Sequence, residues 1–249
     1  TRCDEAVLRL ALGHAPGDPL QALIGAGFLL SGQNGLGFVH DRVLEAAYEL
    51  TPVQQRESLH AHIALAMLRA WPERLHELLF EITHQLQRAS PCGFAADDRA
   101  VFLQLLHEAG LRARDSGAYE QAAGYLRTAE QLLNHGGTLE SRATLGFALC
   151  SMAAECDLQL ARVAAAKAQL NECRQRARST LDRARVYQLQ ARLDTLQGDH
   201  QAAIGSALSG LQMLGIHLAP GLDPQQVEAS HARVQALIEQ QGRHCLESL

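Results

Sequence analysis

The chain has 249 residues, of which 47% are hydrophobic, 20% charged and 4% aromatic, a composition typical of a globular protein with a sizeable core. The formal net charge of −5 lacks the basic excess of proteins that bind nucleic acid in bulk, so we expect no nucleic-acid partner. No signal-peptide pattern and no apolar run of roughly 18 residues occurs, so we expect a cytoplasmic protein without a membrane partner. Because the chain begins with Thr1, we also expect it to be a piece of a longer protein.

Two short helices are predicted near the N-terminus. The first spans residues 4–12 with Asp4 as its cap, and Asp18–Pro19 opens the second, over residues 20–26. The second helix carries no positive charge, whereas a helix that reads DNA needs one. We therefore do not expect DNA binding by this unit.

A β-hairpin is predicted next, because an Asn-Gly pair between short apolar runs is the strongest local hairpin signal. Asn34–Gly35 lies between the apolar runs 27–30 and 37–39. The order of helix, helix and hairpin is that of a winged-helix unit.

Two longer helices follow the hairpin. Asp41 is placed to cap the first, and Thr51–Pro52 combines a capping residue with proline at the first helical position of the second. Apolar residues recur at helical spacing in both segments. They are Val43, Leu44, Ala47 and Leu50 in the first, and Leu59, Ile63, Ala66 and Met67 in the second.

One string across this region resembles the junction just past the nucleotide-binding module in STAND-type signalling ATPases, including bacterial multidomain sensor kinases of the histidine or serine/threonine type. The string consists of Phe38-Val39-His40-Asp41-Arg42, Ala46-Ala47-Tyr48, Arg56 and Leu59-His60. In that family the chain runs from an ATPase core through a winged-helix unit into a helical repeat array. This chain contains no phosphate-binding loop, and its sole lysine, Lys167, lies in an Ala-rich run. The resemblance therefore implies no cofactor within this segment, ATP or ADP in the parent protein, and an intramolecular contact with an upstream ATPase domain.

Val39–His40–Asp41 has a more specific counterpart. In nucleotide-sensing ATPases related to immune receptors, a Met-His-Asp triplet begins a helix after the winged-helix hairpin, and its histidine reaches the phosphate of the nucleotide. The triplet here is similar in place and in two of three residues, which implies that His40 and Asp41 sense nucleotide in the parent protein. The alternative is that Asp41 only caps the helix and His40 forms a local hydrogen bond.

A linking segment, residues 72–96, is predicted to hold one helix over residues 73–88. From Asp97 the sequence becomes a series of Ala-rich helix pairs in which small residues recur. Ala122, Ala166 and Ala203 occupy matched positions, 44 and 37 residues apart. The small residues permit tight turns and close helix packing. The residues assigned to this packing are Gly117, Tyr119, Ala122, Ala129, Ala166, Gly198 and Ala203.

The pattern resembles the tetratricopeptide repeat, whose period is about 34 residues, although no Trp marks the first helices and no Pro closes a repeat. Thr138 and Thr180 are predicted to cap the first helices of the second and third pairs. Asp223–Pro224 opens a last helix, whose apolar stripe we expect to lie over the third pair. The first-helix stripes are Val101, Phe102, Leu105, Leu106 and Ala109; Leu145, Leu149, Met152, Ala153 and Cys156; and Leu181, Ala184, Tyr187, Gln188, Ala191 and Leu196.

The pattern of the other histidines and of the clustered arginines indicates ordinary structural roles. His60 and His62 lie on different faces of one helix, and His76 and His84 are two turns apart beside acidic residues, so metal or acid–base chemistry is not favoured. An arginine run fits helix-end charge and surface ion pairs better than a phosphate site. It comprises Arg174, Arg176, Arg178, Arg183, Arg185 and Arg192.

Six cysteines occur without a Cys-x-x-Cys pair, which argues against a zinc ribbon and a compact disulfide framework. We expect free thiols, as in a reducing cytosol. Cys3 and Cys245 lack the basic neighbours and helix start that activate a thiol. The others are Cys92, Cys150, Cys156 and Cys173.

The sequence therefore predicts an all-α fold: a tetratricopeptide-like antiparallel helix-pair array preceded by a small winged-helix unit with one β-hairpin. The predicted parts are 1–71 (entry unit), 72–96 (linker) and 97–249 (repeats). We expect a non-catalytic regulatory segment that binds a protein or peptide on its repeat array. Two alternatives stay open: the sensor array of an ATP-dependent transcription activator, and a helical repeat domain that binds a small molecule.

Overall fold

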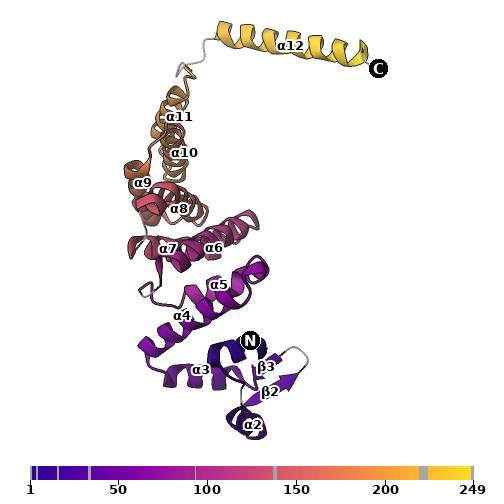
Figure 1. Cartoon of the computed structure of the whole chain (residues 1–249). Coiled ribbons are helices and arrows are strands. Elements are labelled where there is room, and N and C mark those ends of the chain that lie inside the picture. The colour runs from indigo at the N-terminus through magenta and orange to yellow at the C-terminus, as the bar shows by residue number, and fades with distance from the viewer. Residues whose placement is uncertain are drawn as a thin grey trace. The chain divides into compact units, whose positions relative to one another are not determined.

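The computed structural model describes residues 2–3, 5–15, 17–32, 35–92, 94–136, 139–218 and 224–247 (Figure 1). The chain forms two compact units, Thr1–Ala177 and Arg178–Leu249. It is predominantly helical with one small antiparallel sheet, so the predicted all-α class with a β-hairpin is confirmed. Within the described residues, no helix has the length and apolarity to cross a bilayer.

The first unit begins with a small sheet flanked by two helices. Helices α1 (Glu5–Leu12) and α2 (Asp18–Gly25) precede the predicted hairpin of β2 (Leu29–Gly32) and β3 (Gly35–Phe38). A third strand, β1 (Arg2–Cys3), pairs antiparallel with β3 and was not predicted, because two residues give no alternation to detect. The predicted turn residue Asn34 and the predicted cap Asp4 lie outside the described residues.

Helices α3 (Asp41–Leu50) and α4 (Val53–Ala70) correct two predicted caps. His40, in extended backbone conformation, is the N-cap of α3, and no side chain caps this helix, so Asp41 is its first helical residue. Thr51 ends α3 instead of capping α4, and its hydroxyl donates to the carbonyl of Ala47 at 3.2 Å. Pro52 is the N-cap of α4. Helix α3 therefore begins one residue earlier than predicted and α4 one residue later, because Pro52, with ψ 144°, is not in a helical conformation.

The single helix predicted over residues 73–88 is in fact two pieces. A 3₁₀ turn, η1 (Pro72–Arg74), is followed by turns and then by α5 (Leu79–Leu86). The restart at Leu79 places Leu79, Ile82 and Leu86 in the core. Helix α5 packs on both α4 and α6 (Ala96–Asp115), so the core runs through the predicted linker without a break at residues 71 or 96.

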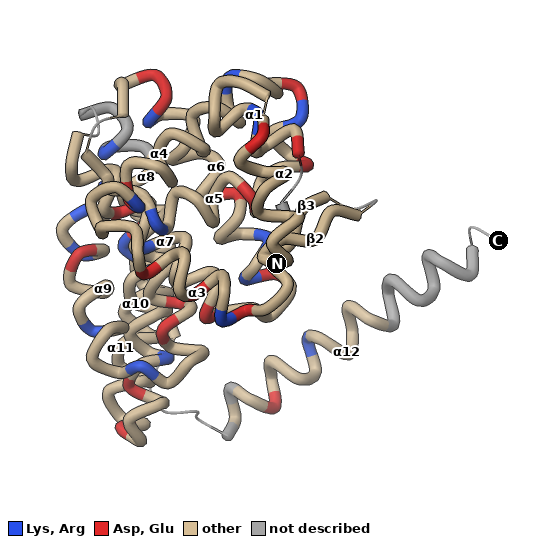
Figure 2. Tube along the Cα trace, turned by 90° about the horizontal axis from the view of Figure 1, so that it is seen from below, with Lys and Arg blue, Asp and Glu red and all other residues tan. Residues whose placement is uncertain are grey.

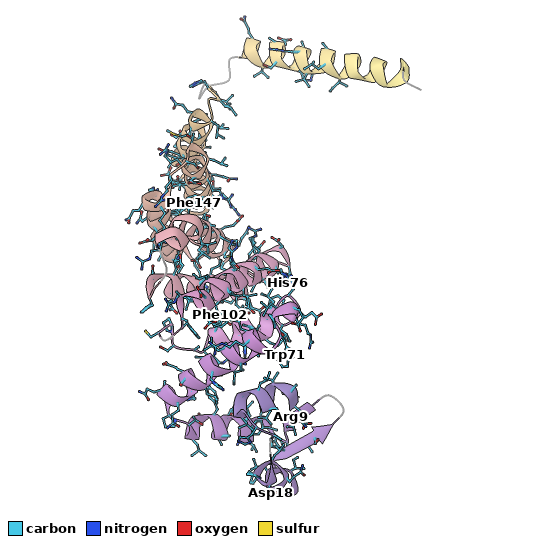
Figure 3. All side chains as sticks on the ribbon, in the orientation of Figure 1. Arg9, Asp18, Trp71, His76, Phe102 and Phe147 are labelled. Carbon is cyan, nitrogen blue, oxygen red and sulfur yellow. The ribbon has the colours of Figure 1, made fainter. Side chains whose placement is uncertain are left out.

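Two helix pairs complete the first unit, and they supply most of its core. Helix α6 packs on α7 (Tyr119–Asn134), α7 packs on α8 (Leu139–Gln159), and α8 packs on α9 (Val163–Arg176) (Figure 1). Phe102, labelled in Figure 3, is fully buried and meets Phe94 edge to face at 5.1 Å between ring centroids. Four residues of the second predicted stripe are buried as expected: Leu149, Met152, Ala153 and Cys156.

The turns between paired helices have one geometry in all three pairs. Gly117, Ala161 and Gly198 have left-handed φ values of 81°, 55° and 79°. In each turn the next amide donates to the carbonyl five residues back, as Ala118 does to Ala113 at 2.8 Å. The corresponding distances are 2.8 Å from Arg162 to Asp157 and 2.9 Å from Asp199 to Asp194. These are Schellman motifs, which satisfy the last carbonyls of the helix.

The residues assigned to repeat packing follow these turns at constant spacing. Five residues beyond the three turn positions lie Ala122 and Ala166, each fully buried, and Ala203, 9% exposed. Seven residues further lie Ala129, Cys173 and Gly210, all buried. Tyr119, at the start of α7, is half-buried. Small side chains therefore line the contact between the helices of each pair.

Within the second unit, α10 (Thr180–Leu196) packs on α11 (His200–Met213). The cap of α10 is Ser179 and not Thr180, because Ser179 and Asp182 form a reciprocal capping box. The third predicted stripe is partly wrong: Leu181 is 69% exposed, whereas Leu189 and Leu193 are buried.

The last helix, α12 (Pro224–Glu247), begins where predicted, but its cap Asp223 lies outside the described residues, as does Thr138. Its expected stripe does not cover a neighbour, because Val227, Val234 and Ile238 are all exposed. The prediction that this stripe packs on the third pair is wrong.

Candidate functional site

The first candidate site is an apolar cavity in the sheet-containing part of the first unit. It has a volume of about 620 Å³. Helices α1, α2 and α3 and strands β2 and β3 all contribute to its walls, chiefly through Leu8, Leu12, Leu20, Leu23, Leu36 and Phe38. Strands β2 and β3 carry no charged residue, and α2 carries only Asp18 at its start (Figure 2). Of the described residues that line the cavity, only His14 has an ionisable side chain.

This cavity is open because the surrounding elements bury little. Among the described side chains of residues 5–50, only Leu36 is buried. Leu12 and Leu23 are each 45% exposed although both line the cavity. The sequence explains this locally: α1 and α2 are short helices that present leucines to one side, and β3 points Leu36 inward but leaves Phe38 near the rim. An apolar surface of this kind is typical of a site that another molecule covers.

The predicted nucleotide-sensing residues do not line the cavity, but residues on either side of them in the chain do. His40 and Asp41 begin α3, directly after β3, and both are exposed. The amide of Val39, the first residue of the triplet, donates to the carbonyl of Phe28 at 3.1 Å. This bond holds the segment before α3 against the residue that precedes β2. Phe38 and Leu44, two residues before His40 and four after it, both line the cavity. His40 therefore adjoins the cavity wall along the chain, although its own side chain is not part of that wall.

Three other residues of the string between Phe38 and His60, namely Tyr48, Arg56 and His60, form a second cluster, which ties α3 to α4 and α5. The hydroxyl of Tyr48 lies 3.1 Å from Nε2 of His60, and Nδ1 of His60 lies 2.7 Å from Oε1 of Gln85. An amide oxygen only accepts, so Nδ1 of His60 donates to it and Nε2 accepts from Tyr48. The guanidinium of Arg56 lies over the ring of Tyr48, 4.6 Å from its centroid. Three residues of the string thus have a common structural role in holding helices together.

The other histidines weighed in the sequence analysis, His62, His76 and His84, do not converge on one site. His62 is exposed, on a different face from His60. His76, labelled in Figure 3, is also exposed and lies 3.1 Å from Oε1 of Glu108, whereas His84 contacts Arg88. Burial and the nearby Arg88 lower the pKa of His84, which favours the neutral imidazole. Within the described residues, no group of three or more His, Cys, Asp or Glu side chains is arranged to hold a metal ion.

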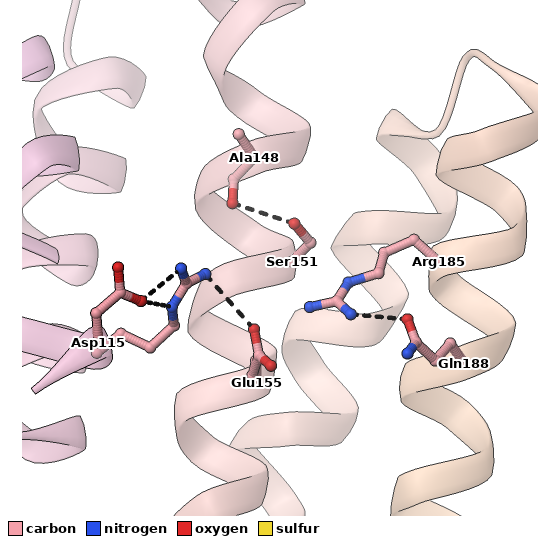
Figure 4. Close-up of polar contacts among 7 residues, drawn as sticks. Asp115, Ala148, Ser151, Glu155, Arg185 and Gln188 are labelled. Atoms are coloured by element: carbon pink, nitrogen blue, oxygen red, sulfur yellow. Dashed lines mark hydrogen bonds and ion pairs between the residues drawn. The ribbon is translucent and has the colours of Figure 1, made fainter. Parts of the chain in front are cut away.

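The arginine run is divided between the two units and forms local contacts. Arg176 donates to the carbonyl of Gly146 at 3.2 Å and pairs with Glu172, and Arg174 donates to Asn171 at 2.8 Å. In the second unit, Arg185 donates to Gln188 at 2.7 Å (Figure 4). These contacts are those of ordinary helix-surface pairs.

Sequence reasoning missed two features. The cavity gave no sequence signal, since its walls come from five elements and an apolar residue at a cavity looks like a core residue. Sequence reasoning also missed the approach of Cys150 to Cys173, which lie 23 residues apart and match no cysteine motif. Cys173 occupies a repeated small-residue position, and that pattern is the only signal that pointed to its burial.

Comparisons with protein-family models, with curated proteins and with solved structures found no match.

Proposed function

We propose that this chain is a non-catalytic regulatory and protein-interaction segment of a larger ATP-dependent signalling protein, of the kind found in bacterial multidomain sensor kinases. The observation that carries the proposal is the open apolar cavity with His40 beside it. In this proposal an upstream ATPase domain seats an apolar surface on the cavity. His40 then reaches the phosphate of the ATP or ADP that this domain holds.

The helix pairs support the same function in a different way. Helices α6 to α9 pack in series, so each pair rests on its neighbour and the outer helix faces stay available. In the proposed protein, this array binds a protein or peptide effector in the cytoplasm. Binding there changes the docking of the ATPase domain, because α4 and α5 join the array to the sheet-containing part.

The test uses the parent protein and one pair of variants. Leu23→Glu places a charge in the wall of the cavity, where Leu23 is 45% exposed, so we expect it to release the docked domain and raise basal signalling. Leu50→Glu is the matched control, since Leu50 is 85% exposed and does not line the cavity. Equal signalling from the two variants would rule out docking at the cavity.

A second variant tests the role of His40. A hydrogen bond to a charged phosphate is worth roughly 1.5–3 kcal/mol, so His40→Ala should weaken ADP retention by about tenfold or more. Asp41→Ala removes only a favourable charge at the start of α3, worth about 0.3–1 kcal/mol of helix stability. Unchanged ADP affinity in His40→Ala would leave His40 with a local structural role alone.

Because the proposal assigns no chemistry to this segment, the isolated chain should not hydrolyse ATP. ATP turnover that survives repurification, measured against a buffer blank, would refute this part of the proposal.

The cavity also supports a second function, the binding of a small apolar ligand, since about 620 Å³ is within the usual range of ligand pockets. Binding of the fluorescent dye 8-anilinonaphthalene sulfonate distinguishes domain docking from ligand binding. If an ATPase domain covers the cavity, the isolated chain should bind the dye there and the parent protein should not. If the cavity is a ligand pocket, both should bind it, and Leu23→Glu should abolish the signal in both.

A further inference from the structure

Two buried cysteines face each other across the second helix pair. Sγ of Cys150, on α8, lies 2.9 Å from Sγ of Cys173, on α9. Both residues are fully buried and both thiols are free. The sulfur atoms are thus less than about 1 Å further apart than the roughly 2.05 Å of a disulfide bond. A small rotation of the two side chains would bring them to bonding distance.

The surroundings of Cys150 favour its protonated thiol. The hydrogen bond with Cys173 and burial raise the pKa of Cys150 far above its ordinary value. Glu130 of α7 acts in the same direction, whereas Arg176 of α9 favours the thiolate. A buried thiol of this kind does not react while the helices stay closed.

The two cysteines differ in their distance along the chain from a helix end. Cys173 lies in the last turn of that helix, three residues before Arg176, whereas Cys150 lies in the middle of α8. Helix ends open more readily than helix centres, so brief unwinding of this turn exposes Cys173 first.

We propose that Cys150 and Cys173 form a reversible intrachain disulfide that cross-links α8 to α9, with a low-molecular-weight disulfide such as oxidised glutathione as the oxidant. The thiolate of Cys173 attacks one sulfur of the oxidant, and the first glutathione leaves as a thiolate. Cys150, after losing its proton, attacks Sγ of Cys173 and displaces the second glutathione. Two protein thiols are oxidised, one glutathione disulfide is reduced, and the two protons end on the two glutathione thiols.

The cross-link would join the helices at their closest approach. Cys173 occupies the same repeat position as Ala129 and Gly210, where a small residue lets the paired helices meet. The disulfide closes a loop that contains the whole turn between α8 and α9, which restricts the unfolded chain and opposes separation of the helices. Oxidation would therefore fix the α8–α9 pair in its packed form, while reduction leaves it free to open.

Peptide mapping tests the proposal on the unmodified chain. The folded protein is incubated with glutathione disulfide, then denatured, alkylated and digested with trypsin and a glutamate-specific protease. Cleavage after Glu155 separates Cys150 from Cys156, so the expected product joins residues 143–155 to residues 173–174. Cys156 should stay alkylated in residues 156–162, which makes it an internal control.

Thermal unfolding gives a second reading. Oxidation should raise Tm by on the order of 5–10 °C, and dithiothreitol should reverse the change. Cys173→Ser should lose this response, whereas Cys92→Ser, at an exposed cysteine, should keep it. Should Cys173→Ser fail to fold, the peptide map of the unmodified chain still decides. The proposal is overturned if Cys150 and Cys173 are both alkylated under conditions that convert Cys92 to a mixed disulfide, or if each carries glutathione without a cross-link.

Discussion

Residues 5–50 and the helix pairs α6–α9 are both rich in leucine and alanine, yet they use these side chains differently. Among the described side chains of residues 5–50, only Leu36 is buried, and several leucines surround an open cavity. Helix α7 alone buries seven residues. The difference lies in the small residues: the pairs place Ala122 and Ala166 where two helices meet, so their larger neighbours are enclosed from both sides. Apolar content alone therefore does not decide whether a surface closes into a core.

The largest expected effect concerns one large side chain from each region. Phe102→Ala removes a fully buried ring, so it should lower the free energy of unfolding by about 3–5 kcal/mol. Leu23→Ala, in the cavity wall, should cost at most about 1 kcal/mol, because Leu23 is already half exposed. Urea unfolding of both variants measures the two costs. Similar losses would mean that the cavity wall is packed as tightly as the pairs.

A smaller effect is expected from overpacking. Ala166→Leu forces extra volume between paired helices and should destabilise the chain by about 1–3 kcal/mol. Ala168→Leu makes the same change at an exposed position of α9 and should have little effect. If thermal unfolding shows the same shift for both variants, the assigned contact between α8 and α9 is in error.

The third prediction concerns a buried carboxyl in the pairs. Burial raises the pKa of Glu130, and Nε2 of Gln169 donates to it at 3.1 Å, while Oε1 of Gln169 is buried without a partner. Glu130→Gln supplies an N–H for that oxygen and should stabilise the fold by about 1 kcal/mol at pH 7.

This gain should depend on pH. An acid with a raised folded pKa destabilises the fold as pH rises from its unfolded pKa, about 4.3, through its folded pKa. The advantage of Glu130→Gln should therefore shrink as pH falls through the raised folded pKa of Glu130 toward about 4.3, below which the carboxyl is protonated in both states. Chemical unfolding at pH 7 and pH 4 checks this, and a pH-independent gain would assign it to the hydrogen bond alone.

The smallest expected effect distinguishes the three matched turns. Ala161 has φ 55° where the other turns have glycine, so Ala161→Gly should relieve strain and stabilise the chain by roughly 0.5–1 kcal/mol. Gly117→Ala should have the opposite sign, although an added Cβ there meets no atom within 4 Å, because the penalty comes from φ alone. Matching Tm shifts of opposite sign are expected, and a loss in both variants would contradict the shared turn geometry.

Helix periodicity predicted the paired helices well because the repeated small residues set both the turn and the packing position. It failed where the outcome depends on a specific side-chain hydrogen bond at a helix end or on which neighbouring helix covers a residue. The N-cap of α10 is Ser179 and not the predicted Thr180, because both residue types can cap a helix and only the side-chain geometry of the capping box distinguishes them. Leu181 is 69% exposed whereas Leu189 and Leu193 are buried, so the face of α10 that meets α11 includes residues that the predicted stripe left out.

The candidate site was less accessible to sequence reasoning. His40 was predicted through a resemblance, and the structure places it at the N-cap of α3, two residues after Phe38 of the cavity wall. The cavity itself depends on how five elements are arranged, which no local pattern specifies. The same is true of Cys150 and Cys173, whose contact exists only because α8 and α9 are antiparallel neighbours.

The capping box at the start of α10 has a consequence for how such arrays change over evolution. The carboxylate of Asp182 accepts from the amides of Arg178 and Ser179, and the Ser179 hydroxyl accepts from the amide of Asp182, each at 3.0 Å. The helix start is therefore specified by residues of its own unit, whichever helix precedes it. A duplication or deletion that joins the chain at residues 177 and 178 would transfer α10 with its start signal intact, so the array could gain or lose units without redesign of the junction.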